Sequence, residues 1–313
     1  RPSKIEMVDG VKVYRLEHHL DIGSTPITLG LPGLLRSIAD DFDLIHINFP
    51  YPWTDLLYLA LFRSRKVVLT YHSDIFRLRA SFSGLLLQAY NPIIHWVLAR
   101  VSAVIASSPN CIENSPFLSR HPTKSRVIPM PVDVASLGEV EQNLVENERQ
   151  SFGKFVLFVG RLVPYKGVRY LIEALERVPN AGLVVVGRGP LAAELKVLAE
   201  KLGLSARIHF LGKTTDDRLR ALYHACRCLV LPSVSHAEGF GMVLAEAMAC
   251  GKPVISTQLQ TGTSYVNIDG VTGYVVPPCD SKALADKIEV LMHDEEIHRN
   301  MGQQAKLRAE TEF

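Results

Sequence analysis

The chain has 313 residues, of which 47% are apolar and 21% charged, and its 34 Lys and Arg against 32 Asp and Glu leave a net charge of +2. This composition excludes a disordered, fibrous or disulfide-stapled protein, and the near-neutral balance gives no electrostatic support for a nucleic-acid partner. A chain of this length is expected to form two domains.

Short β-branched runs alternate with helix-period segments, a pattern typical of βαβ units and parallel sheets. We therefore predict an α/β fold with two doubly wound domains. The first, residues 1–131, shows no opening strand and Gly-rich turn before Val11, so we expect that its first βα unit is missing and the chain truncated. Its predicted strands are Val11–Arg15, Asp43–Ile47, Lys66–Tyr71, Val101–Ala106 and Arg126–Pro129.

The pattern lapses after Val132, where a stretch rich in Glu and Asn has no apolar periodicity. We interpret residues 132–153 as a linker and residues 154–313 as a second, complete doubly wound domain. Its predicted strands are Phe155–Val159, Leu183–Val186, Arg207–Leu211, Cys228–Leu231, Val254–Ser256 and Tyr274–Val276.

Ligands of open parallel sheets bind at the carboxyl ends of the strands, so the loops there are the candidate sites. The loop Gly160 to Gly167 places Arg161 and Lys166 five residues apart before a helix. Two such cations can hold a diphosphate and stabilise its departure. The alternative is a pair of solvated surface charges.

The next loop, Gly187-Arg188-Gly189-Pro190-Leu191-Ala192, fits G-x-G-x-x-G/A and formally suggests a dinucleotide site. The acidic residue expected about 20 positions later is absent, because residues 203–213 contain no Asp or Glu. A nucleotide can still bind here. The alternative is a tight turn that needs glycine dihedrals.

The third loop is the most informative, because it combines carboxylates with the start of a helix. Glu238 lies in a Gly-rich loop, a helix is predicted from about Gly241 to Gly251, and Glu246 lies one turn inside it. Free amides near the helix start favour an anion. The alternative places Glu246 in a surface salt bridge and Glu238 in solvent. The amides expected to face a ligand belong to Gly239, Phe240, Gly241, Met242 and Val243.

The E-x7-E spacing of Glu238 and Glu246, followed by Ala-Met-Ala-Cys-Gly-Lys-Pro-Val, resembles the retaining nucleotide-sugar glycosyltransferases of the GT-B fold, family 4, group 1 type. The Arg161–Lys166 loop looks like their diphosphate motif. The resemblance implies that Arg161 and Lys166 hold the diphosphate, that Glu238 binds hydroxyls of the donor sugar and that Glu246 binds the ribose. It also places the nucleobase between the Gly187-Arg188-Gly189 turn and the backbone at Leu211 and Gly212.

In the first domain, His72 follows a predicted strand in Thr-Tyr-His-Ser-Asp and resembles the family's acceptor-side His. The resemblance implies that His72 contacts the donor sugar or the acceptor. The stretches 46–52 and 262–266 look like those of bacterial O-antigen mannosyl- or rhamnosyltransferases.

No metal or other cofactor is expected, and the donor substrate would be a UDP- or GDP-sugar. Asp41-Phe42-Asp43 matches a D-x-D string that binds Mn²⁺ in transferases of another fold, but the GT-B relatives use cations and a helix start instead. The Cys226-x-Cys228 pair is expected to be core packing.

Five Cys with no CxxC pair favour a cytoplasmic location, and no apolar run reaches the 18 residues of a membrane span. Six cations against one acid between Leu61 and Arg100, amid apolar residues, are suited to peripheral contact with the inner membrane face if the acceptor is lipid-linked. The alternative is a solvated basic face.

The predicted function is therefore transfer of a hexose, with retention, from a nucleoside diphosphate sugar to a glycan or lipid-linked glycan hydroxyl. Two alternatives stay open at this point. One is a sugar-nucleotide epimerase of the same fold, and the other is a non-catalytic nucleotide-sugar-binding subunit.

Overall fold

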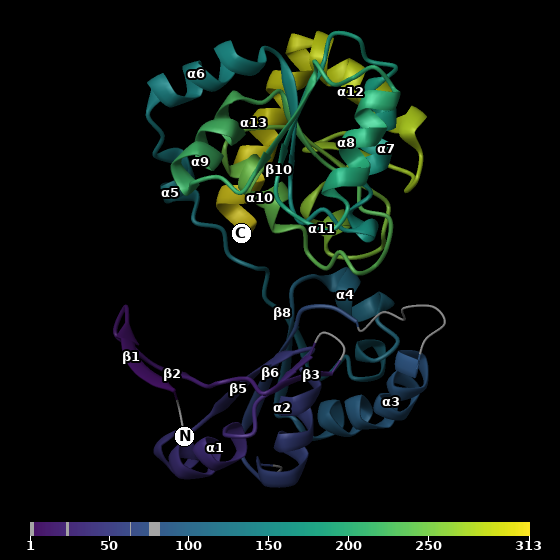
Figure 1. Ribbon diagram of the computed structural model, residues 1–313. Coiled ribbons are helices and arrows are strands. Elements are labelled where there is room, and N and C mark those ends of the chain that lie inside the picture. The colour runs from purple at the N-terminus through teal and green to yellow at the C-terminus, as the bar shows by residue number, and fades with distance from the viewer. Residues whose placement is uncertain (1–2, 23–24, 63, 75–81) are drawn as a thin grey trace. The chain divides into compact units, whose positions relative to one another are not determined.

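The computed structural model describes residues 3–22, 25–62, 64–74 and 82–313 (Figure 1). The chain divides into two compact units. The first unit consists of Arg1–Ser107 and Ile112–Ile128, and the second of Ser108–Cys111 and Pro129–Phe313. Each contains a parallel sheet with helices packed on it, so the predicted α/β class is confirmed.

The first unit is built on a four-stranded parallel sheet with the order β5-β6-β7-β8. Four of the five predicted strands form this sheet, with ends that differ by one or two residues. The fifth, Val11–Arg15, is a strand but pairs antiparallel with Lys4–Val8, a strand before Val11 that was not expected. Two antiparallel pairs, β1 with β2 and β3 with β4, precede this sheet. The elements are β1 (Lys4–Val8), β2 (Val11–Arg15), β3 (Leu20–Ile22), β4 (Thr25–Ile27), α1 (Leu31–Ile38), β5 (Ile45–Phe49), α2 (Pro52–Leu57), β6 (Val67–Tyr71), α3 (Phe82–Arg100), β7 (Ala103–Ala106), α4 (Pro109–Asn114) and β8 (Ser125–Val127).

The second unit contains a six-stranded parallel sheet with the order β11-β10-β9-β12-β13-β14. The strand order reverses between β9 and β12, which is the topological switch point where doubly wound sheets bind their ligands. The elements are α5 (Val134–Gly138), α6 (Gln142–Phe152), β9 (Phe155–Val159), α7 (Val168–Leu175), β10 (Gly182–Val186), α8 (Ala192–Lys201), β11 (Ile208–Gly212), α9 (Asp216–Ala225), β12 (Cys228–Leu231), α10 (Met242–Ala249), β13 (Val254–Thr257), α11 (Thr263–Val266), β14 (Gly273–Val276), α12 (Ser281–His293) and α13 (Glu295–Glu312).

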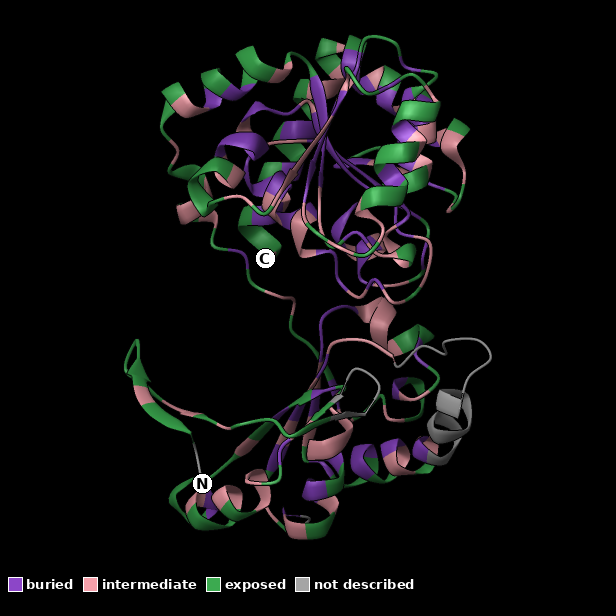
Figure 2. Cartoon of the chain, viewed as in Figure 1, coloured by how far each residue is buried: buried purple, intermediate pink, exposed green. Residues whose placement is uncertain are grey.

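The four inner strands of the second sheet, β10, β9, β12 and β13, are buried at almost every position. Helices α7, α8 and α12 lie on one side and α9, α10 and α13 on the other (Figure 1). The central strands β9 and β12 are consequently apolar at almost every position, as expected for a covered parallel sheet, and they form the buried centre of this unit (Figure 2). This rigid core fixes the ends of the strands and thereby the loops that follow them.

The segment predicted as a linker, residues 132–153, differs from that expectation. It contains helices α5 and α6, and Val145 of α6 is 1% exposed within the core of the second unit. Glu148, 8% exposed, accepts two bonds from Arg218 of α9, at 2.7 and 3.2 Å. Helix α6 is anchored by Val145, by Leu144 and Phe152, which pack against the same core, and by the Glu148–Arg218 ion pair. These few apolar residues stand among polar ones and gave no clear helical periodicity in the sequence.

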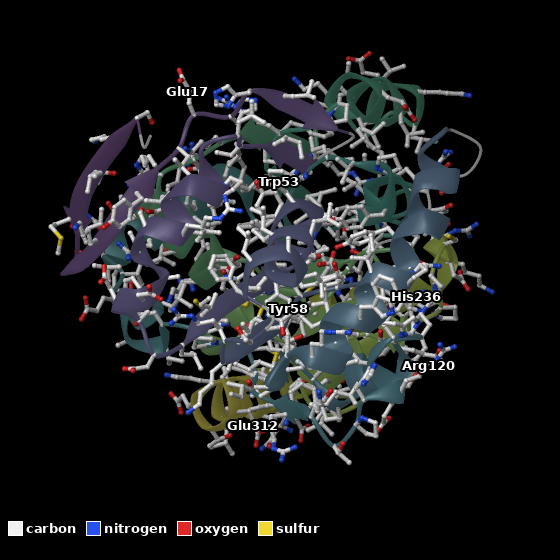
Figure 3. All side chains as sticks on the ribbon, turned by 90° about the horizontal axis from the view of Figure 1, so that it is seen from below. Glu17, Trp53, Tyr58, Arg120, His236 and Glu312 are labelled. Carbon is white, nitrogen blue, oxygen red and sulfur yellow. The ribbon has the colours of Figure 1, made fainter. Side chains whose placement is uncertain are left out.

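Asp55 is a buried carboxylic acid in the first unit. It lies on α2 and is 0% exposed. In the sequence it falls between Trp53 and Tyr58, the two residues that Figure 3 labels in this region. Tyr90 of α3 donates a hydrogen bond to Oδ2, while Oδ1 has no partner among the described residues. Burial raises the pKa of Asp55 from 3.8 to about 6. The folded chain therefore binds a proton here that the unfolded chain releases at lower pH.

This raised pKa predicts a pH-dependent stability. The stabilising proton is fully bound below about pH 4 and is lost as the pH rises through about 6, which removes about 3 kcal/mol of unfolding free energy. Asp55→Asn keeps an oxygen that accepts from Tyr90 and cannot ionise, so the variant is expected to lack this loss. Urea unfolding of both proteins between pH 4.5 and 8 measures the difference. Parallel profiles for the two proteins would show that Asp55 does not titrate as described.

Candidate active site

The loops that follow β9, β10, β11 and β12 meet at the carboxyl edge of the second sheet. The backbone amide of Gly160 donates to Val186 O at 2.9 Å, and that of Gly187 donates to Gly212 O at 2.8 Å. The amide of Val234 donates to Tyr165 O at 2.8 Å. Each loop is thus hydrogen-bonded to its neighbour, and together the loops form a continuous backbone surface.

Two glycines allow this close approach. Gly187 has a φ of +139°, and a Cβ there would lie 1.8 Å from Gly160 O. Gly167 has a φ of +64°, and a Cβ there would lie 2.0 Å from Pro232 O. A side chain at either position would separate the loops, so glycine is required on both steric and conformational grounds.

Lys166 and Glu238, predicted separately from two loops, form a buried ion pair. Lys166 Nζ lies 2.7 Å from Glu238 Oε2, and the two side chains are 12% and 8% exposed. Ser233, which follows β12 and is 0% exposed, donates a further bond to the same oxygen at 2.7 Å. The alternative that placed Glu238 in solvent is therefore wrong. Oε1 of Glu238 makes no hydrogen bond or ion pair within the described residues and can accept from a ligand.

Arg161 is the exposed cation of the same loop. Its guanidinium makes no hydrogen bond or ion pair within the described residues. An exposed Arg in a loop hydrogen-bonded to its neighbours has five donors available for phosphate oxygens. Arg161 and Lys166 thus offer one open and one partly buried positive charge at the same edge.

Helix α10 begins at this edge, as predicted. Gly241 is its N-cap, with a φ of +81° and no side-chain cap, so the amides of Met242 and Val243 in the first turn receive no side-chain acceptor. Gly239 and Phe240 precede it, but the Phe240 ring is 4% exposed and packs edge-on against Phe313. Of Phe240, only the backbone can serve a ligand here.

Glu246 is half-buried on α10, one turn after its start. Its Oε2 accepts a bond of 2.5 Å from the hydroxyl of Tyr223, which lies on α9 and is 1% exposed. The surface salt bridge considered as an alternative is thus not formed. Oε1 of Glu246 makes no hydrogen bond or ion pair within the described residues.

The turn Gly187-Arg188-Gly189 and the end of β11 at Leu211 and Gly212 lie together, as the Gly187–Gly212 bond shows. Arg188 is exposed, and its Nε lies 3.7 Å from the position a Cβ would take at Gly212. Leu211 is partly buried. This part of the edge presents backbone groups and a flexible Arg instead of a fixed acid, consistent with the missing NAD-type carboxylate.

His72 belongs to the first unit, immediately after β6. Its Nε2–H donates to Asn48 Oδ1 of β5 at 2.9 Å. Burial lowers the pKa of His72, and the nearby His46 lowers it further. The ring is therefore neutral at pH 7, with Nδ1 as an acceptor. That His72 serves the same site as the residues of the second unit stays a prediction.

Comparison with known proteins identifies the family. Residues 3–136 match the model of Glycosyltransferase Family 4, and residues 140–308 match that of Glycosyl transferases group 1. The O-antigen chain mannosyltransferase C of Escherichia coli is 36% identical over 294 residues, which are 94% of this chain and 77% of the relative. The chain belongs to the group 1 glycosyltransferases of family 4.

Further relatives agree with this membership. The D-rhamnosyltransferase WbpZ of Pseudomonas aeruginosa is 36% identical over 96% of this chain and 77% of its own length. Anabaena HepE, solved in complex with UDP and glucose, is 26% identical with a TM-score of 0.75 over 90% of this chain and 77% of that one. Sucrose-phosphate synthase of Thermosynechococcus elongatus has a TM-score of 0.77 at 25% identity, covering 100% and 82%. The predicted GT-B fold and family resemblance are thus confirmed, and the protein is a glycosyltransferase.

Two residues that contact the site carboxylates of this glycosyltransferase were not predicted. Ser233 follows a strand and Tyr223 lies within a helix, so each is indistinguishable in sequence from an ordinary strand-end serine and core tyrosine. The signal that identifies them is spatial, since each hydroxyl donates to a carboxylate singled out by the E-x7-E spacing.

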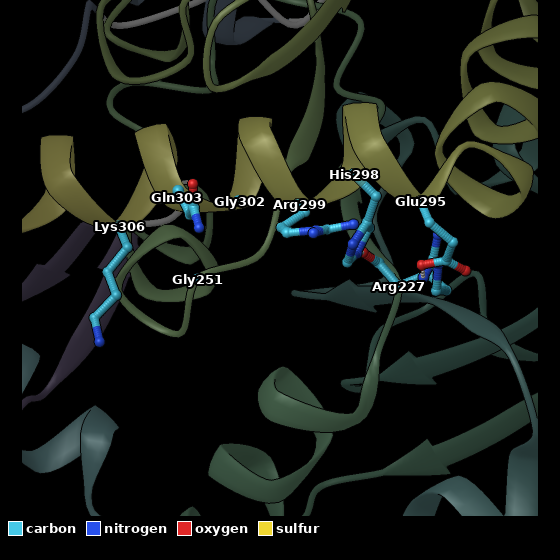
Figure 4. Close-up of a pocket in the computed structure, with 8 residues that line it drawn as sticks. All are labelled: Arg227, Gly251, Glu295, His298, Arg299, Gly302, Gln303 and Lys306. Carbon is cyan, nitrogen blue, oxygen red and sulfur yellow. Dashed lines mark hydrogen bonds and ion pairs between the residues drawn. The ribbon is translucent and has the colours of Figure 1, made fainter.

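A cavity of about 370 Å³ lies elsewhere on the second unit of the glycosyltransferase (Figure 4). Its lining includes Arg227, Gly251 and Arg299, and Arg227 and Gly251 precede the amino ends of β12 and β13. The predicted donor residues are at the carboxyl edge, so this cavity is separate from them. Within the described residues no group of three or more His, Cys, Asp or Glu is arranged to hold a metal ion.

The predicted membrane-contact region of the glycosyltransferase falls partly outside the described residues. Arg63, Phe76, Arg77 and Arg79 lie there, so the suggested basic surface between Leu61 and Arg100 stays a prediction. No helix in the described part of the chain combines the length and the apolar character needed to cross a membrane.

Proposed function

We propose that this glycosyltransferase moves a hexose, with retention at the anomeric carbon, from a nucleoside diphosphate sugar to a hydroxyl of a glycan or lipid-linked glycan. The observation that carries the proposal is the Lys166–Glu238 pair beside the exposed Arg161 and the uncapped start of α10. This arrangement combines positive charge for a diphosphate with a carboxylate for sugar hydroxyls.

In the proposed reaction the bond between the anomeric carbon and the diphosphate oxygen breaks, and the acceptor oxygen forms its bond to that carbon on the same face. The acceptor's proton passes to the departing diphosphate oxygen, so no protein nucleophile is needed. Arg161, the two remaining donors of Lys166 and the amides of α10 stabilise the negative charge that develops on the leaving group.

Each predicted residue has a role in this proposal. Oε1 of Glu238 accepts from donor-sugar hydroxyls, and Glu246 accepts from the ribose. The turn Gly187–Gly189 and Leu211 flank the nucleobase, while His72 contacts the donor sugar or the acceptor. The relatives named for transfer of mannose and of D-rhamnose, two six-carbon sugars, support a hexose-type donor and a place in O-antigen polysaccharide synthesis.

We also propose that the enzyme works in the cytoplasm, with its acceptor carried at the inner face of the membrane. Cys226, Cys228, Cys250 and Cys279 form no disulfide among the described residues, which suits a reducing compartment. The lipid-linked form of the acceptor is inferred from the O-antigen relative and from the charge pattern of residues 61–100.

The test is thermal unfolding of the purified chain with UDP, GDP, their common sugars and NAD. A nucleoside diphosphate at 100 times its Kd is expected to add about 2.7 kcal/mol of stability. Arg161→Ala is expected to abolish most of this response, whereas Arg299→Ala, which removes an exposed cation at the opposite edge, is expected to keep it. A response to NAD alone, or to none of these compounds, would contradict the proposal.

A further inference from the structure

The two donor-site carboxylates share an arrangement that the proposed roles do not require. Each has one oxygen, Oε2, bound by a buried hydroxyl, which is Ser233 for Glu238 and Tyr223 for Glu246. Glu238 also has Lys166 as a charged partner. Glu246 pairs with no cation within the described residues, so the Tyr223 hydroxyl is the only hydrogen-bond partner of its carboxylate observed there.

The hydroxyl of Tyr223 is a permanent donor. Burial raises the pKa of Tyr223 well above 10, and the adjacent Glu246 carboxylate raises it further. The phenol therefore stays protonated at any physiological pH, and its O–H must point to an acceptor because it is shielded from water. That acceptor is Oε2 of Glu246, and a hydrogen bond from a hydroxyl to a carboxylate is stronger than one between neutral groups.

Helix α9, which carries Tyr223, is itself firmly held. Arg218 makes a bidentate ion pair with Glu148 of α6. Nε2–H of His224 donates to Leu137 O of α5 at 2.8 Å. These contacts lie on either side of Tyr223 in the sequence. A shift of α9 would break these contacts with two other helices, and the ring of Tyr223 is itself buried, so its hydroxyl is held at Glu246 without a ligand.

We propose that Tyr223 is a positioning residue of the donor site. Its hydroxyl occupies Oε2 of Glu246 and so presents Oε1 to the ribose of the nucleotide, where it accepts from the 2′- or 3′-hydroxyl. The inference rests on the proposed function, since it requires a ribose at Glu246. It adds that recognition of the ribose depends on a side chain that never touches the ligand. The competing explanation is that Tyr223 is a core tyrosine that merely uses Glu246 to satisfy its own hydroxyl.

The test compares binding of ribose and deoxyribose nucleotides. For whichever of UDP and GDP stabilises the chain, Kd is measured by calorimetry for that nucleotide and for its 2′-deoxy and 3′-deoxy forms. The wild type is expected to bind at least one deoxy form about 10-fold to 100-fold more weakly, as for a lost bond to a charged group. Tyr223→Phe is expected to reduce this discrimination to less than about 3-fold, because a mobile Glu246 can also be satisfied by water.

A general loss of stability would not produce that result, because it would weaken binding of all nucleotides equally. Measurements are made well below the melting temperature of each variant. Tyr274→Phe, on the edge strand β14, is the matched control and is expected to discriminate like the wild type. Glu246→Gln is expected to lose discrimination, and adding Tyr223→Phe to it is expected to change nothing more.

The outcomes distinguish a failure of the role proposed for Glu246 from a failure of the role proposed for Tyr223. If Glu246→Gln keeps full discrimination, the ribose does not bind at Glu246, and the role proposed for that residue fails. If Glu246→Gln loses discrimination while Tyr223→Phe retains it, the positioning role of Tyr223 is overturned and the proposed function stands.

Discussion

Replacing Lys166 with Met is expected to lower kcat/KM for transfer from the nucleotide sugar by about 10²-fold to 10³-fold, the usual cost of removing one charge-stabilising donor. Met keeps most of the aliphatic stem but loses the ammonium that lies 2.7 Å from Glu238. In the proposed roles, the variant affects binding of both the diphosphate and the sugar of the donor, because Glu238 also loses its charged partner. Steady-state kinetics with purified enzyme and acceptor measure the effect.

Because Lys166 and Glu238 are in direct contact, their substitutions are not expected to add. The double variant Lys166→Met/Glu238→Gln should be less impaired than the product of the single effects, as in any coupled pair. Lys201→Met, on the exposed last turn of α8, is the control and is expected to leave kinetics unchanged. Lys166→Met with kcat/KM within 3-fold of wild type would exclude Lys166 from the reaction.

Gly187→Ala is expected to destabilise the second unit by at least about 3 kcal/mol, through left-handed strain and direct overlap with backbone. The added Cβ would lie 1.8 Å from Gly160 O, and relief of this overlap would strain the Gly160–Val186 bond on one side or the Gly187–Gly212 bond on the other. Nucleoside diphosphate binding is expected to be lost with it, because the displaced loop carries Arg161. Urea unfolding and calorimetric titration measure the two effects.

Gly203→Ala measures the cost of backbone strain at a positive φ without the steric overlap expected for Gly187→Ala. Gly203 also has a positive φ, +69°, but a Cβ there would meet nothing within 4 Å. Its substitution should therefore cost only the conformational term, about 1 kcal/mol, and should leave nucleotide binding intact. Equal destabilisation by the two substitutions would mean that the contact between the loops after β9 and β10 is not tight.

The donor loops could be predicted because their chemistry is local in sequence. Gly160 to Gly167, the Gly187 turn and the E-x7-E spacing each combine glycine with charge after a β-branched run, and the topology of a parallel sheet brings such loops to one edge. The sequence predicted that Lys166 and Glu238 lie at the same edge of the sheet. It did not predict that they form an ion pair with each other.

The remaining features depend on long-range contacts. Tyr223 and Ser233 are ordinary in sequence and become part of the site only through the packing of α9 on α10 and the turn after β12. Helix α6 was not predicted because its few apolar residues form a weak pattern, and part of its anchoring is an ion pair with a residue 70 positions away. A pattern of apolar residues carries no information about such pairs.

Helices α5 and α6 also determine how the halves of this enzyme can be exchanged. Arg218 and His224 of α9 depend on residues of these helices, and Val145 fills part of the core. In a chimera joined at residue 154, α9 would pack against a segment from another protein. The bonds of Arg218 and His224 that hold the helix of Tyr223 in place would be lost. Recombination that keeps the proposed donor site intact must therefore join the halves before Val132, so the half proposed to bind the nucleotide is inherited together with the stretch that precedes its first strand.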